Sequence, residues 1–296
     1  MQIHNIPIDD TFAEAFPMTA ARLVVTAQSP NWALTAGQVA TGYASSVIGC
    51  DVEAGIERWL TPDNTPDGRP GVSILFFAFS RDALQKAAIN RVGQCILTCP
   101  TTACYNGLPV VKEKSIRIGG NLRFFGDGWQ SSKKLAGRRY WRLPVMDGEF
   151  LCEDLFGTIK GVGGGNFLIL AEDQAQGLYA AELAVEAIRK IPGVIMPFPG
   201  GIVRSGSKVG SRYKKLKAST NDAYCPTLRA VTKTALPENV CAVYEIVIDG
   251  VEQSAIEQAM KAGIVAACRP GVVRISAGNY GGNLGPFHFH LHKILQ

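Results

Sequence analysis

The stretch GNFLILA at residues 165–171 and the stretch AVYEIVI at residues 242–248 begin two successions of features that run in the same order. Each stretch leads through a short acidic turn into an alanine-rich segment, and then into a second apolar run that begins Gly-Val. Short apolar runs rich in β-branched and aromatic residues predict strands, and the alanine-rich segments predict helices. A succession that recurs in fixed order indicates a repeated strand–helix–strand unit.

The N-terminal half carries the same pattern twice, less clearly. Its expected strand, helix and closing strand lie first at residues 21–27, 29–41 and 45–50, and again at residues 72–79, 81–92 and 94–98. Ser29 followed by Pro30 is a typical cap and first turn for the earlier helix. Two units in each half predict an α+β protein of two similar ferredoxin-like α/β sandwich lobes with mainly antiparallel sheets. We place the N-terminal lobe at residues 1–150 and the C-terminal lobe at residues 151–296.

The remaining expected elements surround these units. Strands are expected at residues 115–125 and 139–145, and helices at residues 177–190 and 254–268. The Ser-Ala-Ile-Glu sequence that opens the last helix is a capping-box pattern. Residues 202–239 are polar and rich in Gly, Ser and Lys. A loop of this length in a compact domain is usually functional or disordered.

The composition of the 296-residue chain is that of a globular protein, with 47% apolar and 19% charged residues. No apolar run approaches the ~18 residues of a membrane span. The N-terminus has acids where a signal peptide needs cations and an apolar stretch. We therefore expect a cytoplasmic protein that does not contact a membrane. The eight cysteines include no Cys-x-x-Cys pair, which favours reduced, buried thiols over disulfides.

The chain has a formal net charge of +5 and a local basic run at residues 204–217. This run is either a solvated loop or a surface that attracts anionic ligands. The sequence contains no recognisable nucleic-acid module, and aromatic residues do not alternate with its cations as stacking platforms would require. Small molecules that carry carboxylate or phosphate groups are therefore better candidate partners than nucleic acid.

Three histidines alternate with apolar residues near the C-terminus, at positions 288, 290 and 292. Alternate histidines can bind zinc, but the simpler interpretation is a terminal sheet strand with one polar face, so we predict no metal site. No Ser-His-Asp order, GxSxG elbow or GxxxxGK[ST] loop is present. These absences disfavour covalent serine catalysis and nucleotide hydrolysis.

Glu245 is the most informative polar residue. Its neighbours on one face of the expected strand are Val243 and Val247, so it stands on an otherwise apolar face. One interpretation is an exposed edge position. The other is a buried carboxyl, whose pKa must rise because desolvation penalises the charged form. Such an acid can donate a proton or a hydrogen bond to a developing oxyanion.

Several blocks together resemble one family from end to end, the formylmethanofuran:tetrahydromethanopterin formyltransferases. The matching blocks lie at residues 10–16 (DTFAEAF), 65–71 (TPDGRPG), 124–128 (FFGDG), 164–167 (GGNF), 197–203 (PFPGGIV), 207–211 (SKVGS), 219–226 (STNDAYCP), 243–247 (VYEIV) and 275–279 (ISAGN). The resemblance implies two α/β lobes, a homotetramer, and transfer of a formyl group between methanofuran and N5 of tetrahydromethanopterin.

The resemblance also implies that no metal or prosthetic group takes part and that Glu245 is the catalytic acid/base. The transfer would run through a ternary complex and a tetrahedral intermediate, without a covalent enzyme intermediate. Both carriers have anionic tails, for which cations of the basic run are candidate contacts, while the glycine-rich loops are candidate contacts for the pterin or furan. The candidate substrate-binding residues are Phe198, Gly200, Gly201, Lys208, Arg212, Lys214, Lys215, Ser219, Asn221, Asp222 and Tyr224.

This chain is basic, whereas the usual member of the family is strongly acidic. That departure suggests a bacterial methylotroph member, which works as the formyl-transferring component of a formyltransferase/hydrolase complex and has further subunits as partners. The alternative function is that of a non-catalytic component that only scaffolds such a complex. Glu245 and the intact loop blocks argue against this alternative.

Overall fold

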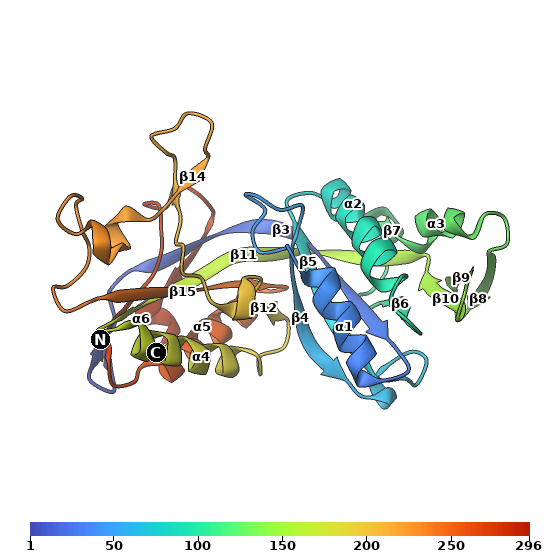
Figure 1. The fold of residues 1–296 in the computed structure, drawn as a ribbon, viewed down its shortest axis with the longest axis horizontal. Helices are drawn as coiled ribbons and strands as arrows, with labels where there is room; N and C mark the ends of the chain where they lie inside the picture. The colour runs from blue at the N-terminus through green and yellow to red at the C-terminus, as the bar shows by residue number, and fades with distance from the viewer. The chain divides into compact units, whose positions relative to one another are not determined.

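The computed structural model describes residues 1–296 and divides into two compact units. One is Met18–Gly161, and the other joins Met1–Pro17 to Val162–Gln296. Two long strands, β3 (Phe12–Thr26) and β11 (Leu155–Ala171), run from one unit into the other (Figure 1). The units therefore differ from lobes divided at residue 150, because both crossings occur inside continuous strands that carry no turn signal.

The unit Met18–Gly161 contains strand, helix, strand twice in succession. After β3 the elements are α1 (Pro30–Thr41), β4 (Glu53–Leu60), β5 (Gly71–Ala78), α2 (Arg81–Arg91) and β6 (Ala103–Asn106). The strands lie in the order β4-β5-β3-β6, with each neighbouring pair antiparallel. Beyond β6 the sheet continues with β10 (Gly148–Glu153), which is parallel to β6, and then with β9 (Arg138–Val145) and β8 (Ser131–Leu135).

The second unit repeats this arrangement. After β11 the elements are α4 (Gln174–Ile188), β12 (Val194–Ile195), β15 (Ala242–Gly250), α5 (Gln253–Ala267) and β16 (Val272–Ser276). The strands lie in the order β12-β15-β11-β16, again antiparallel throughout. The expected mixed α and β architecture with mainly antiparallel strands is therefore confirmed.

Short elements complete both units. In the first they are β7 (Ser115–Arg117), α3 (Gly119–Leu122), a π-helical turn (Val92–Ile96) and 3₁₀ turns at Pro62–Asn64, Lys112–Lys114 and Arg123–Gly126. In the second they are β1 (Gln2–Ile3), β2 (Ile6–Pro7), β13 (Lys208–Val209), β14 (Ala218–Ser219), β17 (Phe287–His290), α6 (Leu291–Ile294) and 3₁₀ turns at Pro199–Gly201, Asp222–Tyr224 and Pro226–Leu228. None of the helices has the length and apolar character needed to cross a membrane.

The two closing strands expected in the N-terminal half are wrong. Residues 45–50 form turns, in which Ser46 O accepts hydrogen bonds from the backbone N–H groups of Gly49 (3.1 Å) and Cys50 (2.8 Å). Residues 94–98 continue α2 as a π-helical turn, closed by Leu97 N donating to Val92 O at 2.8 Å. A short apolar run is compatible with either a strand or a buried helical turn, so periodicity alone could not separate them.

Two further expectations need correction. The strand expected at residues 115–125 ends at Arg117, and α3 begins at Gly119. A Cβ at Gly119 would lie 2.4 Å from Glu153 O, so only glycine permits this close approach. The cap of α5 is Glu252, without a side-chain hydrogen bond, so the capping box at Ser254 does not form. At α1 the expected cap is confirmed, because Ser29 Oγ accepts from Trp32 N at 3.4 Å.

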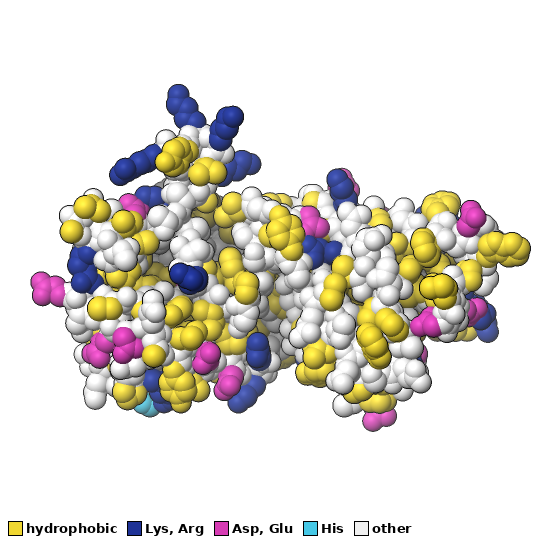
Figure 2. All heavy atoms as spheres, in the orientation of Figure 1, with side chains coloured by type: hydrophobic (Ala, Val, Ile, Leu, Met, Phe, Trp, Pro, Cys, Tyr) yellow, Lys and Arg dark blue, Asp and Glu magenta, His cyan; other side chains and the backbone are white.

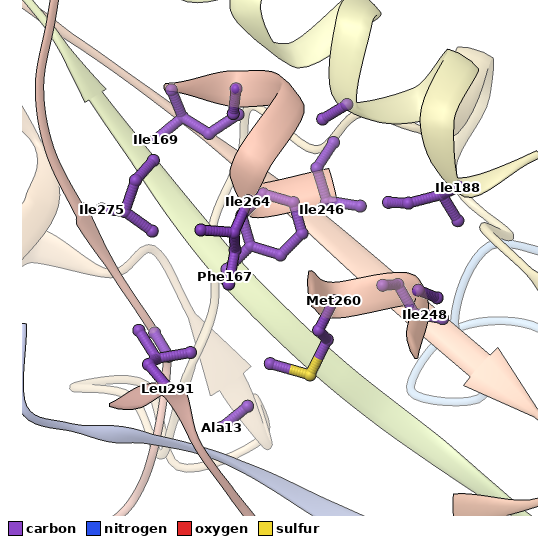
Figure 3. Packing of buried hydrophobic residues seen from close by; sticks show 14 of the residues in the cluster. Ala13, Phe167, Ile169, Ile188, Ile246, Ile248, Met260, Ile264, Ile275 and Leu291 are labelled. Atoms are coloured by element: carbon purple, nitrogen blue, oxygen red, sulfur yellow. The ribbon is translucent and has the colours of Figure 1, made fainter. Parts of the chain in front are cut away.

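The core of the second unit lies between one face of its sheet and the helices α4 and α5. Phe167 of β11 and Ile246 of β15 belong to this core, together with Met260 and Ile264 of α5 (Figure 3). Gly263 lets the helix approach closely, since a Cβ there would lie 2.8 Å from the Phe167 ring. The helices cover this face alone, so the alternate residues of β11 and β15 point to the opposite face.

Candidate active site

Glu245 lies on the sheet face that α4 and α5 do not cover. It is directly opposite Leu168 of β11, and Leu168 is in turn opposite Ser276 of β16, so the three side chains form one row on one face. Leu168 also packs with Leu170, Leu236 and Val240, which form a small apolar cluster. Glu245 therefore stands beside an apolar cluster, as its neighbours in the sequence predict.

The backbone of Glu245 is paired on both sides. On one side is β11, and on the other is Val203, which forms two backbone hydrogen bonds with Glu245, of 2.8 Å and 2.9 Å. The side chain is half-buried. The interpretation of Glu245 as an exposed edge residue is therefore wrong.

Burial raises the pKa of Glu245 to about 7. The cause is desolvation, which penalises the ionised form. A carboxyl with this pKa is present as acid and as carboxylate in comparable amounts at neutral pH. It can therefore both accept and donate a proton, which is the property required of a general acid/base.

A glycine turn directs the chain toward Glu245. The turn Pro199–Gly201 follows β12 and contains Gly200 and Gly201, whose φ angles are 66° and 88°. These left-handed conformations favour glycine. A Cβ at Gly201 would also lie 3.0 Å from Val185 of α4. The predicted residues Phe198, Gly200 and Gly201 thus shape the approach of Val203 to Glu245, which is a structural role beside the predicted binding role.

The predicted cations lie mainly on the hairpin of β13 and β14. Arg212, Lys214 and Lys215 are exposed, and Lys and Arg atoms gather on this projecting hairpin (Figure 2). Lys208 differs from them, because its ammonium forms an ion pair with Asp222. The hydrogen bond from Lys208 lowers the pKa of Asp222. Lys208 and Asp222 therefore fasten the hairpin to the following turn.

The other predicted binding residues lie close to this turn. Ser219 Oγ donates to Gly210 O at 2.8 Å, and Asn221 O accepts from Tyr224 N at 2.9 Å. Tyr224 packs against the apolar cluster of Leu168 and is therefore the predicted binding residue that the structure brings to the face of Glu245. Contact of any of these residues with a carrier stays a prediction.

The three alternating histidines do not share one strand. His288 and His290 lie in β17 on either side of the buried Phe289, whereas His292 lies in α6. The Nε2 atom of His292 is 2.8 Å from Ile8 O. The expected sheet strand with one polar face is confirmed for the first two histidines.

Three further residues around this face were not predicted from the sequence. Asn166 is opposite Val247, and its side chain forms two hydrogen bonds with the backbone of Gly278. Tyr280 follows two residues later, and Glu14 is hydrogen-bonded to the backbone of Tyr280. Asn166 and Glu14 lie within blocks that match the family, but only the pairing of distant strands reveals that they meet.

The comparisons with known proteins identify the family. A model described as formylmethanofuran-tetrahydromethanopterin formyltransferase matches residues 1–145, and one described as FTR, proximal lobe, matches residues 148–294. The chain therefore belongs to the formylmethanofuran–tetrahydromethanopterin formyltransferase family. The family expected from the sequence is confirmed, and so is the class of enzyme, a formyltransferase.

Relatives along the whole chain support this assignment. A formylmethanofuran–tetrahydromethanopterin formyltransferase of Methylococcus capsulatus is 60% identical and covers 100% of both chains. A component of the formyltransferase/hydrolase complex of Methylorubrum extorquens is 53% identical, covering 99% of this chain and 97% of the relative.

Two solved structures have the same fold. One is the formyltransferase/hydrolase complex from Methylorubrum extorquens in complex with methylofuran, with a TM-score of 0.97, 52% identity, and coverage of 100% of this chain and 99% of that chain. The other is the formyltransferase from Methanosarcina barkeri, with a TM-score of 0.94, 50% identity, and coverage of 99% of this chain and 100% of that chain.

The raised pKa of Glu245 predicts a pH-dependent stability. Between the ordinary carboxyl pKa and about 7, the unfolded chain has released this proton while the folded chain keeps it, so the contribution of Glu245 to stability falls as pH rises. Glu245→Gln removes this titration. We expect the variant to gain about 1–3 kcal/mol over the wild type at alkaline pH and to lose this gain in acid. Urea unfolding across the pH range measures the difference, and a difference that does not vary with pH would contradict the prediction.

Proposed function

We propose that this formyltransferase moves a formyl group between formylmethanofuran and N5 of tetrahydromethanopterin, with both carriers bound together. The observation that carries the proposal is Glu245, a half-buried carboxyl with a pKa of about 7 in a chain that is 60% identical to a relative of that name. The names of the relatives supply the carriers, and the burial of Glu245 supports its role as the proton-transfer group.

The chemistry needs one group that moves a proton in both directions. The lone pair of N5 forms a bond to the formyl carbon, the carbonyl electrons move to oxygen, and the proton of N5 passes to the carboxylate of Glu245. Collapse of the tetrahedral intermediate re-forms the carbonyl and breaks the bond to the methanofuran nitrogen, which takes the proton from Glu245. Nothing is oxidised or reduced. A carboxyl with a pKa near neutrality suits both half-reactions.

The transfer needs no covalent enzyme intermediate, because the attacking and leaving groups are both amines of similar leaving ability. What the protein must provide is alignment of the two carriers and stabilisation of the oxyanion. The carriers act as substrates, and we propose that no metal or prosthetic group takes part.

The exposed cations of the β13–β14 hairpin are proposed to bind the anionic tails of the carriers. Arg212, Lys214, Lys215 and Lys217 are exposed on the hairpin. Attraction through exposed charges falls off within about 8–10 Å at physiological ionic strength. The hairpin is therefore suited to capture a carrier and not to take part in the chemical step.

The remaining expectations concern architecture, assembly and location. The strand orders in the two units support a ferredoxin-like form for each lobe. A relative named as part of a formyltransferase/hydrolase complex supports membership in such a complex. We propose a homotetramer as the core of the assembly, located in the cytoplasm. The scaffold alternative is less favoured, because the relatives are named as formyltransferases and Glu245 has the environment of a proton-transfer group.

The first kinetic prediction concerns Glu245. Glu245→Gln keeps the size of the side chain but cannot exchange a proton, so kcat should fall by about 10²–10⁴-fold while the KM values change little. Formyl transfer between the two purified carriers is the measurement. Glu238→Gln changes an exposed glutamate in the same unit and should leave kcat unchanged. If Glu245→Gln turns over as fast as the wild type, Glu245 is not the acid/base. If the wild-type chain itself transfers no formyl group, the scaffold alternative is favoured.

The second kinetic prediction concerns the hairpin. Neutralising Lys214, Lys215 and Lys217 to Gln should raise the KM for a carrier and flatten its dependence on salt, because exposed charge attraction is screened. The value of kcat should be nearly unchanged. A matched control neutralises three exposed lysines on or beside the helices, Lys190, Lys261 and Lys293. If both triple variants have the same KM and salt slope, the hairpin is a solvated loop.

The prediction on assembly is that the purified chain forms a homotetramer. Closed homo-oligomers are the usual form of soluble assemblies. Light scattering coupled to size exclusion measures the mass, for which a tetramer is expected. A fully active monomer would refute it.

A further inference from the structure

Glu14 of β3 is a buried carboxylate held by the backbone of a single loop. It is 2% exposed. One oxygen accepts hydrogen bonds from Tyr280 N at 2.8 Å and Gly282 N at 3.1 Å. The other accepts from Leu284 N and, at 2.9 Å, from Gly285 N. Four donors from six consecutive residues therefore converge on one side chain.

These contacts keep Glu14 ionised. Burial by itself raises the pKa of Glu14, but the backbone N–H groups of Tyr280, Gly285, Leu284 and Gly282 bring it below its ordinary value. A carboxylate that accepts several backbone hydrogen bonds favours its charged form. The loop at residues 280–285 is thus bound to a fixed negative charge.

Gly278, two residues before this loop, is attached to the sheet face of Glu245. Gly278 N donates to Asn166 Oδ1 at 2.6 Å, and Asn166 Nδ2 donates to Gly278 O at 3.1 Å. Asn166 is opposite Val247, two residues along β15 from Glu245, and therefore on the same face. The loop consequently begins over the face that carries Glu245.

Tyr280 connects the loop to the segment that pairs with Glu245. Its hydroxyl donates to Ser207 O at 3.2 Å, and Ser207 is four residues beyond Val203, the backbone partner of Glu245. Burial raises the pKa of Tyr280, and the charges of Glu245 and Glu14 raise it further. Tyr280 is therefore a neutral phenol within electrostatic reach of both carboxyls.

We propose that Glu14 is a positioning residue for formyl transfer: through its four backbone contacts it holds the loop at residues 280–285 so that Tyr280 shields Glu245 from water. The catalytic part of this inference rests on the proposed function. Glu14 does not touch the reacting atoms in this role. Glu14 instead preserves the desolvation of Glu245, which is the cause of its raised pKa.

Other titratable or charged groups surround the same face, and any test must separate them from Tyr280. Tyr224 packs on the apolar cluster of Leu168, and the Lys208–Asp222 pair lies on the hairpin side. Arg274 of β16 is opposite Leu170 on this face and pairs with Asp9 at 3.5 Å. Desolvation is the cause of the raised pKa of Glu245, so the effect of water entry should exceed the effect of these charges.

The test is Glu14→Gln, which replaces one acceptor oxygen by an NH₂ group that faces backbone donors. We expect the pKa of Glu245 to fall from about 7 toward its ordinary value as water enters. The measurement is a ¹³C NMR titration of labelled glutamate side chains, with Glu245 assigned from Glu245→Gln. In the transfer assay, kcat at neutral pH should fall about tenfold to a hundredfold, with smaller changes in KM, and its pH profile should move to lower pH.

Two further variants separate positioning from stability. Tyr280→Ala should lower the pKa of Glu245 as Glu14→Gln does, while Tyr280→Phe keeps the shielding ring and should leave it near 7. If Glu14→Gln fails to fold, the comparison of Tyr280→Ala with Tyr280→Phe still tests the shielding of Glu245. Glu57→Gln is the matched control: Glu57 is a buried carboxylate of the other unit that accepts from Arg22 and Ser73, so its loss should lower the melting temperature without moving the Glu245 titration.

The outcomes are distinct. An unmoved Glu245 titration in Glu14→Gln and Tyr280→Ala, or an equal shift in Glu57→Gln, overturns the inference. A wild-type chain that transfers no formyl group, but whose Glu245 titration shifts as expected in both variants, supports the shielding by the loop and refutes the proposed function instead.

Discussion

The pairing of β11 with β15 is the interaction on which the candidate site depends. Along these strands, alternate residues either enter the core beneath α4 and α5 or stand on the other face. A slip of one residue in this pairing would exchange the two faces, moving Phe167 out of the core and Glu245 into it. The packing of Phe167 between the sheet and α5 therefore also determines that Glu245 stands on the face that no helix covers.

The environment of Glu245 comes from several separate segments of the chain. Val203 supplies the second backbone partner, Leu236 and Val240 supply the apolar cluster, and Asn166 directs the loop that carries Tyr280. Asn166 lies in the long strand β11, whereas Val203, Leu236, Val240 and Tyr280 lie outside the helices and the long strands. The site thus combines one rigid surface with several loops that are held by particular hydrogen bonds, a common way to place catalytic groups.

The sequence allowed the repeated architecture to be predicted because each strand–helix–strand unit carries a local pattern. The helices α1 and α2 and the strands β5 and β15 lie where periodicity and caps indicate. The failures occurred where local pattern is ambiguous. The apolar run at residues 94–98 continues a helix, because a few apolar residues fit either kind of buried structure.

The site was partly predictable for the same reason. The apolar neighbours of Glu245 indicated a carboxyl on an apolar face, and its pKa follows from that burial. Glu14 and Tyr280 could not be found in this way, since their contacts depend on pairings between the two ends of the chain. Composition revealed the basic hairpin, but not that Lys208 is engaged by Asp222 and so differs from its exposed neighbours.

The bonds between Glu14 and its loop also have a consequence for biosynthesis. The two ends of the hydrogen bond from Gly285 are 271 residues apart in the chain. During translation, residue 14 is made long before residues 280–285, so the carboxylate of Glu14 stays hydrated by water until these partners have been made. Contacts of such long range form late and slow the completion of folding. A nascent chain can therefore build the unit Met18–Gly161 while it still lacks the loop at residues 280–285, and the surroundings of Glu245 are complete only after this loop has been made.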